Sequence, residues 1–268
     1  SWPYTKLMNS NNMVDQSAVL IVASAEKAQY LQIPSDRWVF PYAGADSHDT
    51  YAIGERAEFC TSPAIRIAGA RALELAGTGI DDIDFVDVYS CFPSAVQIAA
   101  RELGLPIGDP GRPLTITGGL TFAGGPWNNY VSHSIATMAE RLVSQPGTRG
   151  LITANGGYLT KHSFGVYGTQ PPEHEFRWED VQPAVDREPT RTALVDWSGQ
   201  GIVESWTTPV DRDGQPEKAF LAVRTSRDDD AARVLAVIAD AVEAEVTVTD
   251  DIAGATVHVR PDGTASLG

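Results

Sequence analysis

Apolar residues recur at helical spacing in three stretches of the chain. After Ser62, a helix cap that is followed by a first-turn proline, apolar residues return every three or four positions until Gly77. The same spacing begins again after Pro93 and ends near Gly104, and it is repeated over residues 130–143. The pattern therefore predicts three amphipathic helices in the middle of the sequence.

Short apolar runs between these helices have the character of strands. Residues 83–88 combine apolar residues with the acidic Asp84 and Asp87, and shorter apolar runs cover residues 114–117 and 150–154. Residues 19–22 are apolar and rich in β-branched side chains, which is typical of an interior strand with neighbours on both sides. Strands that alternate with helices predict a layered α/β domain over about residues 38–167, with reactive groups in loops at the strand ends.

The last third of the chain has a different pattern. A polar, proline-bearing stretch over residues 171–190 is typical of a linker. Beyond it the pattern predicts short strands over residues 192–197, 201–208, 219–225 and 255–260, and a helix over residues 231–242. Turn sequences at Asp211–Gly214 and Pro261–Gly263 separate some of these strands. Residues 191–268 are therefore predicted to form a small β-barrel, similar to the oligonucleotide/oligosaccharide-binding (OB) type.

Composition excludes several classes of function. The formal net charge of -15 repels nucleic acid and anionic lipid, so neither is an expected partner even with an OB-like barrel. Two cysteines, Cys60 and Cys91, make neither a disulfide framework nor a metal site. No apolar run approaches the roughly 20 residues of a membrane span, and the start has no signal pattern. We therefore expect a cytoplasmic protein without a metal.

Three glycine- or cysteine-bearing segments lie where strands are predicted to end: Asp81–Phe92, Gly118–Pro126 and Thr153–Gly157. Together they resemble the carboxy-terminal half of a thiolase, in the thiolase-like branch related to the sterol-carrier-protein thiolases. The resemblance implies that residues 1–35, with a strand at 19–23, close the amino-terminal half of the fold. Most of that half would then be missing, so we expect this chain to be a piece of a longer one.

The same resemblance assigns the other parts of the chain. Residues 36–170 correspond to the carboxy-terminal thiolase domain, and residues 171–190 to the linker. Residues 191–268 correspond to the additional carboxy-terminal domain of thiolase-like proteins. The expected fold class is thus α/β, a βαβαβ-type mixed sheet with helices, followed by the OB-like barrel.

The first motif has lost its usual reactive groups. In Tyr89-Ser90-Cys91-Phe92, Tyr89 stands where a thiolase has the asparagine or histidine of its oxyanion hole, and Ser90 replaces a carboxylate. A phenol can still donate one hydrogen bond to a developing oxyanion. The alternative, that Tyr89 only packs, stays open at this point.

The second and third motifs are altered in the same way. Gly125 stands where a thiolase has the histidine that activates its nucleophile, and Asn155 where it has the acid–base cysteine. Glycine has no proton to transfer, and asparagine is no base near neutral pH. Ordinary Claisen condensation is therefore not expected. The glycines themselves allow close approach of a ligand to backbone amides.

The candidate catalytic residues are Tyr89, Cys91, Asn155 and Tyr158. The candidate substrate-binding or coenzyme A-binding residues are Gly118, Gly119, Gly124, Gly125, Pro126, Trp127, Gly156, Gly157, Lys161 and His162. Each has a plainer interpretation: Cys91 as a buried cysteine, Trp127 as a packing residue, Lys161 and His162 as a solvated loop pair.

Three functions fit this sequence. The first is an acyl-CoA-binding or coenzyme A-binding protein of lipid metabolism, nominally of the acetyl-CoA acetyltransferase class, with a degenerate site. The second is a carbon–carbon lyase of the sterol side-chain type that uses Tyr89 and Tyr158 as acid and base. The third is a non-catalytic lipid carrier or scaffold. The first is favoured, and the oligomeric state is left open.

Overall fold

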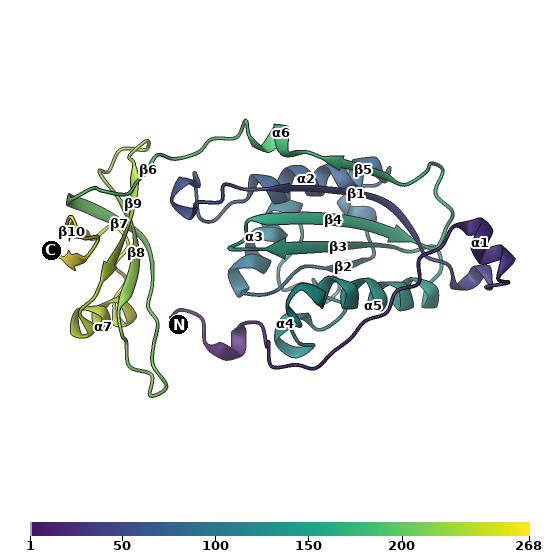
Figure 1. Cartoon of the computed structure of the whole chain (residues 1–268), viewed down its shortest axis with the longest axis horizontal. Coiled ribbons are helices and arrows are strands. Elements are labelled where there is room, and N and C mark those ends of the chain that lie inside the picture. The colour runs from purple at the N-terminus through teal and green to yellow at the C-terminus, as the bar shows by residue number, and fades with distance from the viewer. Residues whose placement is uncertain (1) are drawn as a thin grey trace. The chain divides into compact units, whose positions relative to one another are not determined.

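The chain forms two units, each built on one β-sheet, and the computed structural model describes residues 2–268 (Figure 1). The α/β unit comprises Leu7–Asp49 and Phe59–Glu188. The C-terminal unit comprises Pro189–Gly268 together with residues 2–6 and the loop Thr50–Glu58. A segment from the first quarter of the sequence is therefore part of the C-terminal unit.

The sheet of the α/β unit is mixed, as predicted. Its strands, in the order β2-β3-β4-β1-β5, are β2 (Phe85–Asp87), β3 (Arg149–Gly156), β4 (Lys161–Gly168), β1 (Phe40–His48) and β5 (Arg177–Asp180). The pairs β2–β3 and β1–β5 are parallel, whereas β4 runs antiparallel to both of its neighbours. The expected α/β class is thus confirmed.

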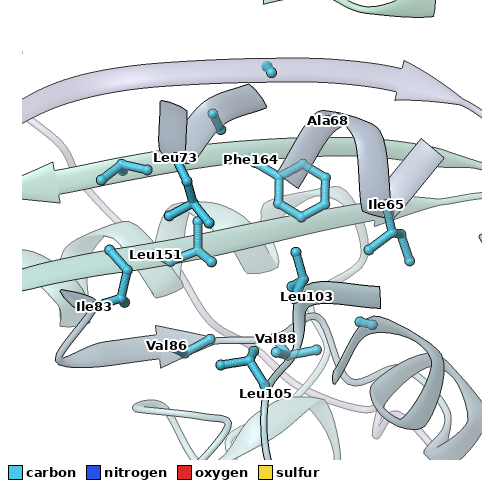
Figure 2. Packing of buried hydrophobic residues seen from close by; sticks show 14 of the residues in the cluster. Ile65, Ala68, Leu73, Ile83, Val86, Val88, Leu103, Leu105, Leu151 and Phe164 are labelled. Carbon is cyan, nitrogen blue, oxygen red and sulfur yellow. The ribbon is translucent and has the colours of Figure 1, made fainter. Parts of the chain in front are cut away.

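Helices α2 (Pro63–Leu75) and α3 (Pro93–Leu103) pack on one face of this sheet (Figure 2). Ser62 begins α2 as predicted, because its hydroxyl accepts a hydrogen bond from the Ile65 amide at 3.2 Å. Phe164 of β4 and apolar residues of both helices share one buried cluster. A Cβ at Gly69 of α2 would overlap Leu103, so this glycine allows the two helices to approach closely.

Helix α5 (Tyr130–Ser144) packs against the opposite face, where Met138 and Leu142 contact Ile152. Ile152 and its neighbour Leu151 belong to different clusters because successive side chains of a strand point to opposite faces. Beside α5 this face holds a cavity of about 350 Å³. Trp178, at its margin, is exposed.

The C-terminal unit contains a six-stranded sheet. Its strands, in the order β11-β10-β7-β8-β9-β6, are β11 (Ala265–Leu267), β10 (Thr256–Val259), β7 (Gly199–Thr207), β8 (Ala219–Arg224), β9 (Arg233–Ile238) and β6 (Ala193–Leu194). Helix α7 (Ala241–Thr249) connects β9 to β10. A parallel bridge between Val237 and Thr264 brings β9 to the residue that precedes β11. The predicted sheet-forming character of this region is thus confirmed, whereas the OB-like barrel stays a prediction.

Arg233 holds the loop Thr50–Glu58 within the C-terminal unit. Its side chain is fully buried and donates to both carboxylate oxygens of Glu204, at 2.5 and 2.8 Å. It also donates to the carbonyl oxygens of Gly54, Arg56 and Ala57. The guanidinium therefore satisfies backbone acceptors that a buried loop would otherwise leave unpaired.

Short helical turns complete the chain. They are η1 (Lys6–Met8), α1 (Ala25–Tyr30), η2 (Ser35–Arg37), η3 (Ile53–Glu55), η4 (Ile80–Asp82), α4 (Gly119–Phe122), η5 (Trp127–Asn129) and α6 (Gln182–Val185).

Two predicted strands are not formed. Residues 19–23 have no regular structure, and Val19, Ile21 and Val22 are exposed. An isolated strand would leave its amides without partners, and no strand described in the chain pairs with this segment. Residues 114–117 also form no strand, because the carboxylate of Asp87 accepts hydrogen bonds from this segment.

Two further predictions about the second half were wrong. The stretch 171–190, predicted as a linker, carries β5 and α6, and β5 extends the sheet beside β1. Residues 231–242, predicted as a helix, contain strand β9, in which Val234, Ala236 and Ile238 are buried while Leu235 is exposed. The helix of this region begins only after Asp240, whose side chain accepts from the Glu243 amide.

Candidate functional site

The end of β2 places the first motif at the edge of the sheet. Beyond Asp87 the chain leaves β2, and the amide of Tyr89 donates to Thr153 Oγ1 at 2.9 Å. Two residues later, Cys91 Sγ lies 3.4 Å from Asn155 Nδ2, near the end of β3. The structure therefore brings the first and third motifs together.

The first pair of glycines packs against this motif. The amides of Gly118 and Gly119 donate to Thr115 Oγ1 and Thr117 Oγ1, at 3.1 and 3.0 Å. Both glycines have positive φ, and a Cβ at Gly119 would lie 2.7 Å from Ser90 Oγ. A side chain at this position would thus be both strained and too close to the first motif.

Residues 9–16, here called the strap, cross the same region. The amide of Ser10 donates to the carbonyl of Cys91 at 2.9 Å, and that of Asn11 to the carbonyl of Leu120 at 3.0 Å. In return, the amide of Gly125 donates to the Asn11 carbonyl at 2.9 Å. The strap therefore connects the first motif to the second pair of glycines.

The strap also takes up the side-chain space at Gly125. A Cβ built on Gly125 would overlap Ser10 Oγ and lie 3.2 Å from Asn12 Oδ1. A Cβ at Gly124 would meet Val14 and the Gln16 amide in the same way. The position at which a thiolase carries its histidine is thus filled by the side chain of Ser10, with that of Asn12 beside it.

Asp87 organises the site, although the sequence analysis did not select it. Its carboxylate is fully buried and accepts hydrogen bonds from five groups. Oδ1 accepts from Thr115 Oγ1 at 2.8 Å, the Ile116 amide at 3.0 Å and Thr117 Oγ1 at 3.3 Å. Oδ2 accepts from Tyr130 Oη at 3.0 Å and Ser134 Oγ at 2.5 Å. One carboxylate therefore joins the first glycine turn to α5.

An aromatic contact extends this network to Tyr89. The rings of Tyr89 and Tyr130 meet edge to face, with centroids 5.2 Å apart and planes inclined by 82°. The only signal of Asp87 in the sequence was an acidic residue between two buried valines of a predicted strand. A buried carboxylate of that kind requires several donors, which local pattern does not identify.

Tyr89, Tyr130 and Cys91 are protonated near neutral pH, because the pKa of each is raised. Burial raises the pKa of Tyr89, and the neighbouring Cys91 raises it further. Burial also raises the pKa of the Cys91 thiol, against a smaller opposite effect of the Asn155 hydrogen bond. The pKa of Tyr130 is raised by burial and, secondarily, by the charge of Asp87. The site therefore offers a phenol and a thiol as hydrogen-bond donors rather than a base.

Other predicted residues lie elsewhere in the α/β unit. Tyr158 lies on the turn between β3 and β4, and its side chain is 78 % exposed. Trp127 is 71 % exposed, and Lys161 is exposed at the beginning of β4. His162 is buried, with Nε2 3.7 Å from Asp49 Oδ2. Within residues 2–268, no three side chains of the metal-binding types gather to hold an ion.

The remaining glycines shape the site's outer turns. Pro126 precedes η5, Gly156 ends β3 opposite Lys161, and Gly157 has a φ of 68° in the following turn.

Comparison with known families matches two regions. The family described as thiolase C-terminal domain-like matches residues 45–127. The family described as the additional C-terminal domain of thiolase-like protein type 1 matches residues 180–264. These regions contain the first two motifs and most of the C-terminal unit, respectively.

Curated relatives match the α/β unit at modest identity. A protein named acetyl-CoA acetyltransferase from Syntrophomonas wolfei is 30% identical over 146 residues, which is 54% of this chain and 34% of the relative. Another of the same name from Methanocaldococcus jannaschii is 29% identical over 99 residues, 37% of this chain and 25% of the relative. The chain thus spans about a third or less of the length of these relatives.

A crystal structure of a monomeric SCP2-thiolase-like protein type 1 from Mycobacterium smegmatis matches the whole chain. The TM-score is 0.84 at 32% sequence identity, and the match covers 100% of this chain and 58% of the other. In the described part of the chain, no helix is long and apolar enough to cross a membrane.

Proposed function

We propose that this chain, which belongs to the thiolase superfamily, binds coenzyme A or acyl-CoA without condensing it. It is of the acetyl-CoA acetyltransferase class by descent, and its site is degenerate. The observation that carries this proposal is the strap, since Ser10 occupies the side-chain space at Gly125.

The remaining groups support binding rather than Claisen chemistry. Condensation needs a base at the substrate α-carbon, and Asn155 cannot take a proton near neutral pH. Tyr89 can donate a hydrogen bond to a thioester carbonyl. The site can therefore hold and polarise a thioester while lacking the groups that would deprotonate it.

The expected partner of this chain is the missing amino-terminal thiolase half. The face of the sheet that carries α5 has a cavity of about 350 Å³, whose margin includes the exposed Phe176 and Trp178. Exposed aromatic residues around a cavity are typical of a surface that packs against another element. We propose that half as its occupant, because the match leaves 42% of the Mycobacterium smegmatis protein (100% less the 58% covered) outside the part that resembles this chain.

Calorimetric titration tests the proposal. Coenzyme A and acetyl-CoA should both bind the purified protein. Tyr89→Phe should weaken the binding of acetyl-CoA more than that of coenzyme A, because only acetyl-CoA has a thioester carbonyl. Tyr30→Phe is the matched control, since Tyr30 is an exposed tyrosine on α1. Thiolytic cleavage of acetoacetyl-CoA at an ordinary thiolase rate, or the absence of binding to either ligand, would overturn it.

A further inference from the structure

Two buried carboxamide oxygens near Cys91 have no hydrogen-bond partner. They are Asn155 Oδ1 and Asn9 Oδ1. Buried polar atoms in folded proteins are nearly always paired, so an unpaired one requires an explanation. An acceptor that stays unpaired in the free protein gains most from a ligand that brings a donor to it.

The surroundings of Asn155 define one of these acceptors. Asn155 stands near the end of β3, opposite His162 of β4 in the ladder. Its Nδ2 donates to Cys91 Sγ at 3.4 Å, which turns the oxygen of the same amide away from the thiol. The oxygen therefore makes no hydrogen bond within the fold.

Asn9 brings the second acceptor to the same region from a distant part of the sequence. It begins the strap, and the next residue, Ser10, donates its amide to the carbonyl of Cys91. The backbone carbonyl of Asn9 accepts from Thr121 Oγ1 at 3.1 Å, so the backbone of this residue is fixed while its side-chain oxygen is unpaired. Asn155 is thus hydrogen-bonded to Cys91 through its amide nitrogen, and Asn9 precedes the residue whose backbone amide is hydrogen-bonded to Cys91.

The site consequently offers donors and acceptors together. Tyr89 and Cys91 are protonated donors, because burial raises the pKa of each, and Asn155 Oδ1 is an acceptor. A hydroxyl both donates and accepts, whereas a ketone or ester oxygen only accepts. A ketone would leave the carboxamide oxygen unpaired, and a hydroxyl would not.

We propose that Asn155, assisted by Asn9, selects thioesters whose acyl group carries a hydroxyl over the corresponding oxo-acyl thioesters. This inference rests on the proposed function, because it names the substrate class of the same site. It is a statement about binding and requires no bond to form or break. The amides of the pantetheine arm are a second source of donors, and they are common to every coenzyme A ester.

Titration calorimetry with four ligands separates these sources. 3-Hydroxybutyryl-CoA carries the hydroxyl, acetoacetyl-CoA the ketone, and butyryl-CoA neither, while coenzyme A has the pantetheine amides alone. The hydroxyacyl ester should bind the unaltered protein about tenfold more tightly than the oxoacyl ester, which corresponds to about 1.4 kcal/mol. Coenzyme A, which has the pantetheine amides alone, should bind less tightly than the hydroxyacyl ester.

Three variants locate the source of the preference. Asn155→Leu removes the acceptor and should abolish the tenfold advantage while butyryl-CoA binding is kept. Asn155→Asp keeps an acceptor and should retain the advantage, and Asn128→Leu, at an exposed asparagine before α5, should leave all four affinities unchanged. Should Asn155→Leu fail to fold, Asn9→Leu is the second test, with a partial loss expected.

The outcomes separate the two proposals. Equal affinities for the hydroxyacyl and oxoacyl esters in the unaltered protein would overturn the inference and leave coenzyme A binding standing. Survival of the full preference in Asn155→Leu would overturn it as well. Absence of binding to all four ligands would overturn the proposed function, and the inference with it.

Discussion

Replacing Asp87 should reveal how much of the site depends on one buried carboxylate. In Asp87→Asn, one oxygen remains, and the Ile116 amide must keep it because a backbone N–H can only donate. The new amide group then faces Tyr130 and Ser134, whose hydroxyls can reverse and accept. Tyr130 can donate to Thr117 Oγ1, which lies 2.8 Å away, so its proton still finds an acceptor.

The magnitude follows from this rearrangement. All five hydrogen bonds lose their charge assistance, which lowers each from roughly 1.5–3 to roughly 0.5–1.5 kcal/mol. Because bonds that share one carboxylate are not additive, the net loss is about that of one or two of them. We therefore expect Asp87→Asn to lower the free energy of unfolding by about 1–3 kcal/mol. Asp87→Ala leaves at least the Ile116 amide and one hydroxyl without an acceptor, so the expected loss is about 4 kcal/mol or more.

Thermal unfolding measures both effects. A loss of 1 kcal/mol lowers Tm by roughly 2–4 °C in a domain of this size, so Asp87→Asn should lower it by about 2–12 °C. Asp81→Asn is the control, because Asp81 is exposed and makes only a 3.5 Å ion pair with Arg112. Equal losses for the asparagine and alanine variants would refute the reasoning, since they would mean that the hydroxyls do not reverse.

Alkaline pH provides a second measurement on the same variant. The raised pKa of Tyr130 stabilises the folded state fully below the ordinary tyrosine pKa of about 10, and this contribution is lost as pH rises through the folded pKa. Asp87→Asn removes the negative charge and brings the folded pKa closer to the ordinary value. Unfolding followed above pH 10 should therefore show a weaker loss of stability with pH in Asp87→Asn than in the unaltered protein.

Three further outcomes are expected. Gly125→His should displace Ser10 and its strap, giving faster proteolytic cleavage within the strap and no gain of thiolase activity; an intact strap would contradict the overlap seen at this position. Iodoacetamide at pH 8 should modify the exposed Cys60 well before Cys91, whose pKa is raised by burial, as peptide mass spectrometry can determine; equal rates would count against a buried thiol. Arg233→Met should destabilise the C-terminal unit by about 3–5 kcal/mol, measured by chemical unfolding, since it leaves the largely buried carboxylate of Glu204 without its cation. A loss below about 1 kcal/mol would argue against a stabilising role of the Arg233 side chain.

Local pattern was sufficient for much of the α/β unit. The cap at Ser62, the stop at Gly104 and the apolar spacing of residues 130–143 predicted α2, α3 and α5 because helix signals lie within a few residues of one another. The apolar run at 19–22 has the same local character but no strand beside it, and pairing partners are not encoded locally. The helix predicted at 231–242 failed for the opposite reason, since its alternation of buried and exposed residues belongs to a strand.

The site was predictable only in part. The motif residues Tyr89, Cys91 and Asn155 were identified, and the structure brings them together at the ends of β2 and β3. The strap was not identified, because Ser10 and Cys91 are far apart in the sequence and neither residue type indicates a hydrogen bond to the other. Asp87 was missed because its partners are common hydroxyl residues whose role depends on the fold.

The hydrogen bonds of Arg233 to the loop Thr50–Glu58 have a practical consequence for the synthesis and the truncation of this protein. Gly54 and Arg233 are separated by 179 positions, and Trp2 pairs with Thr208, so the C-terminal unit joins residues that are far apart in the sequence. The ribosome must therefore release Arg233 before this unit can close, and closure of so long a loop is entropically costly. Expression of residues 189–268 alone would yield a module whose interior cation lacks its carbonyl ligands. Residues 189–268 are continuous in the sequence, but they do not form a complete folding unit without the loop Thr50–Glu58.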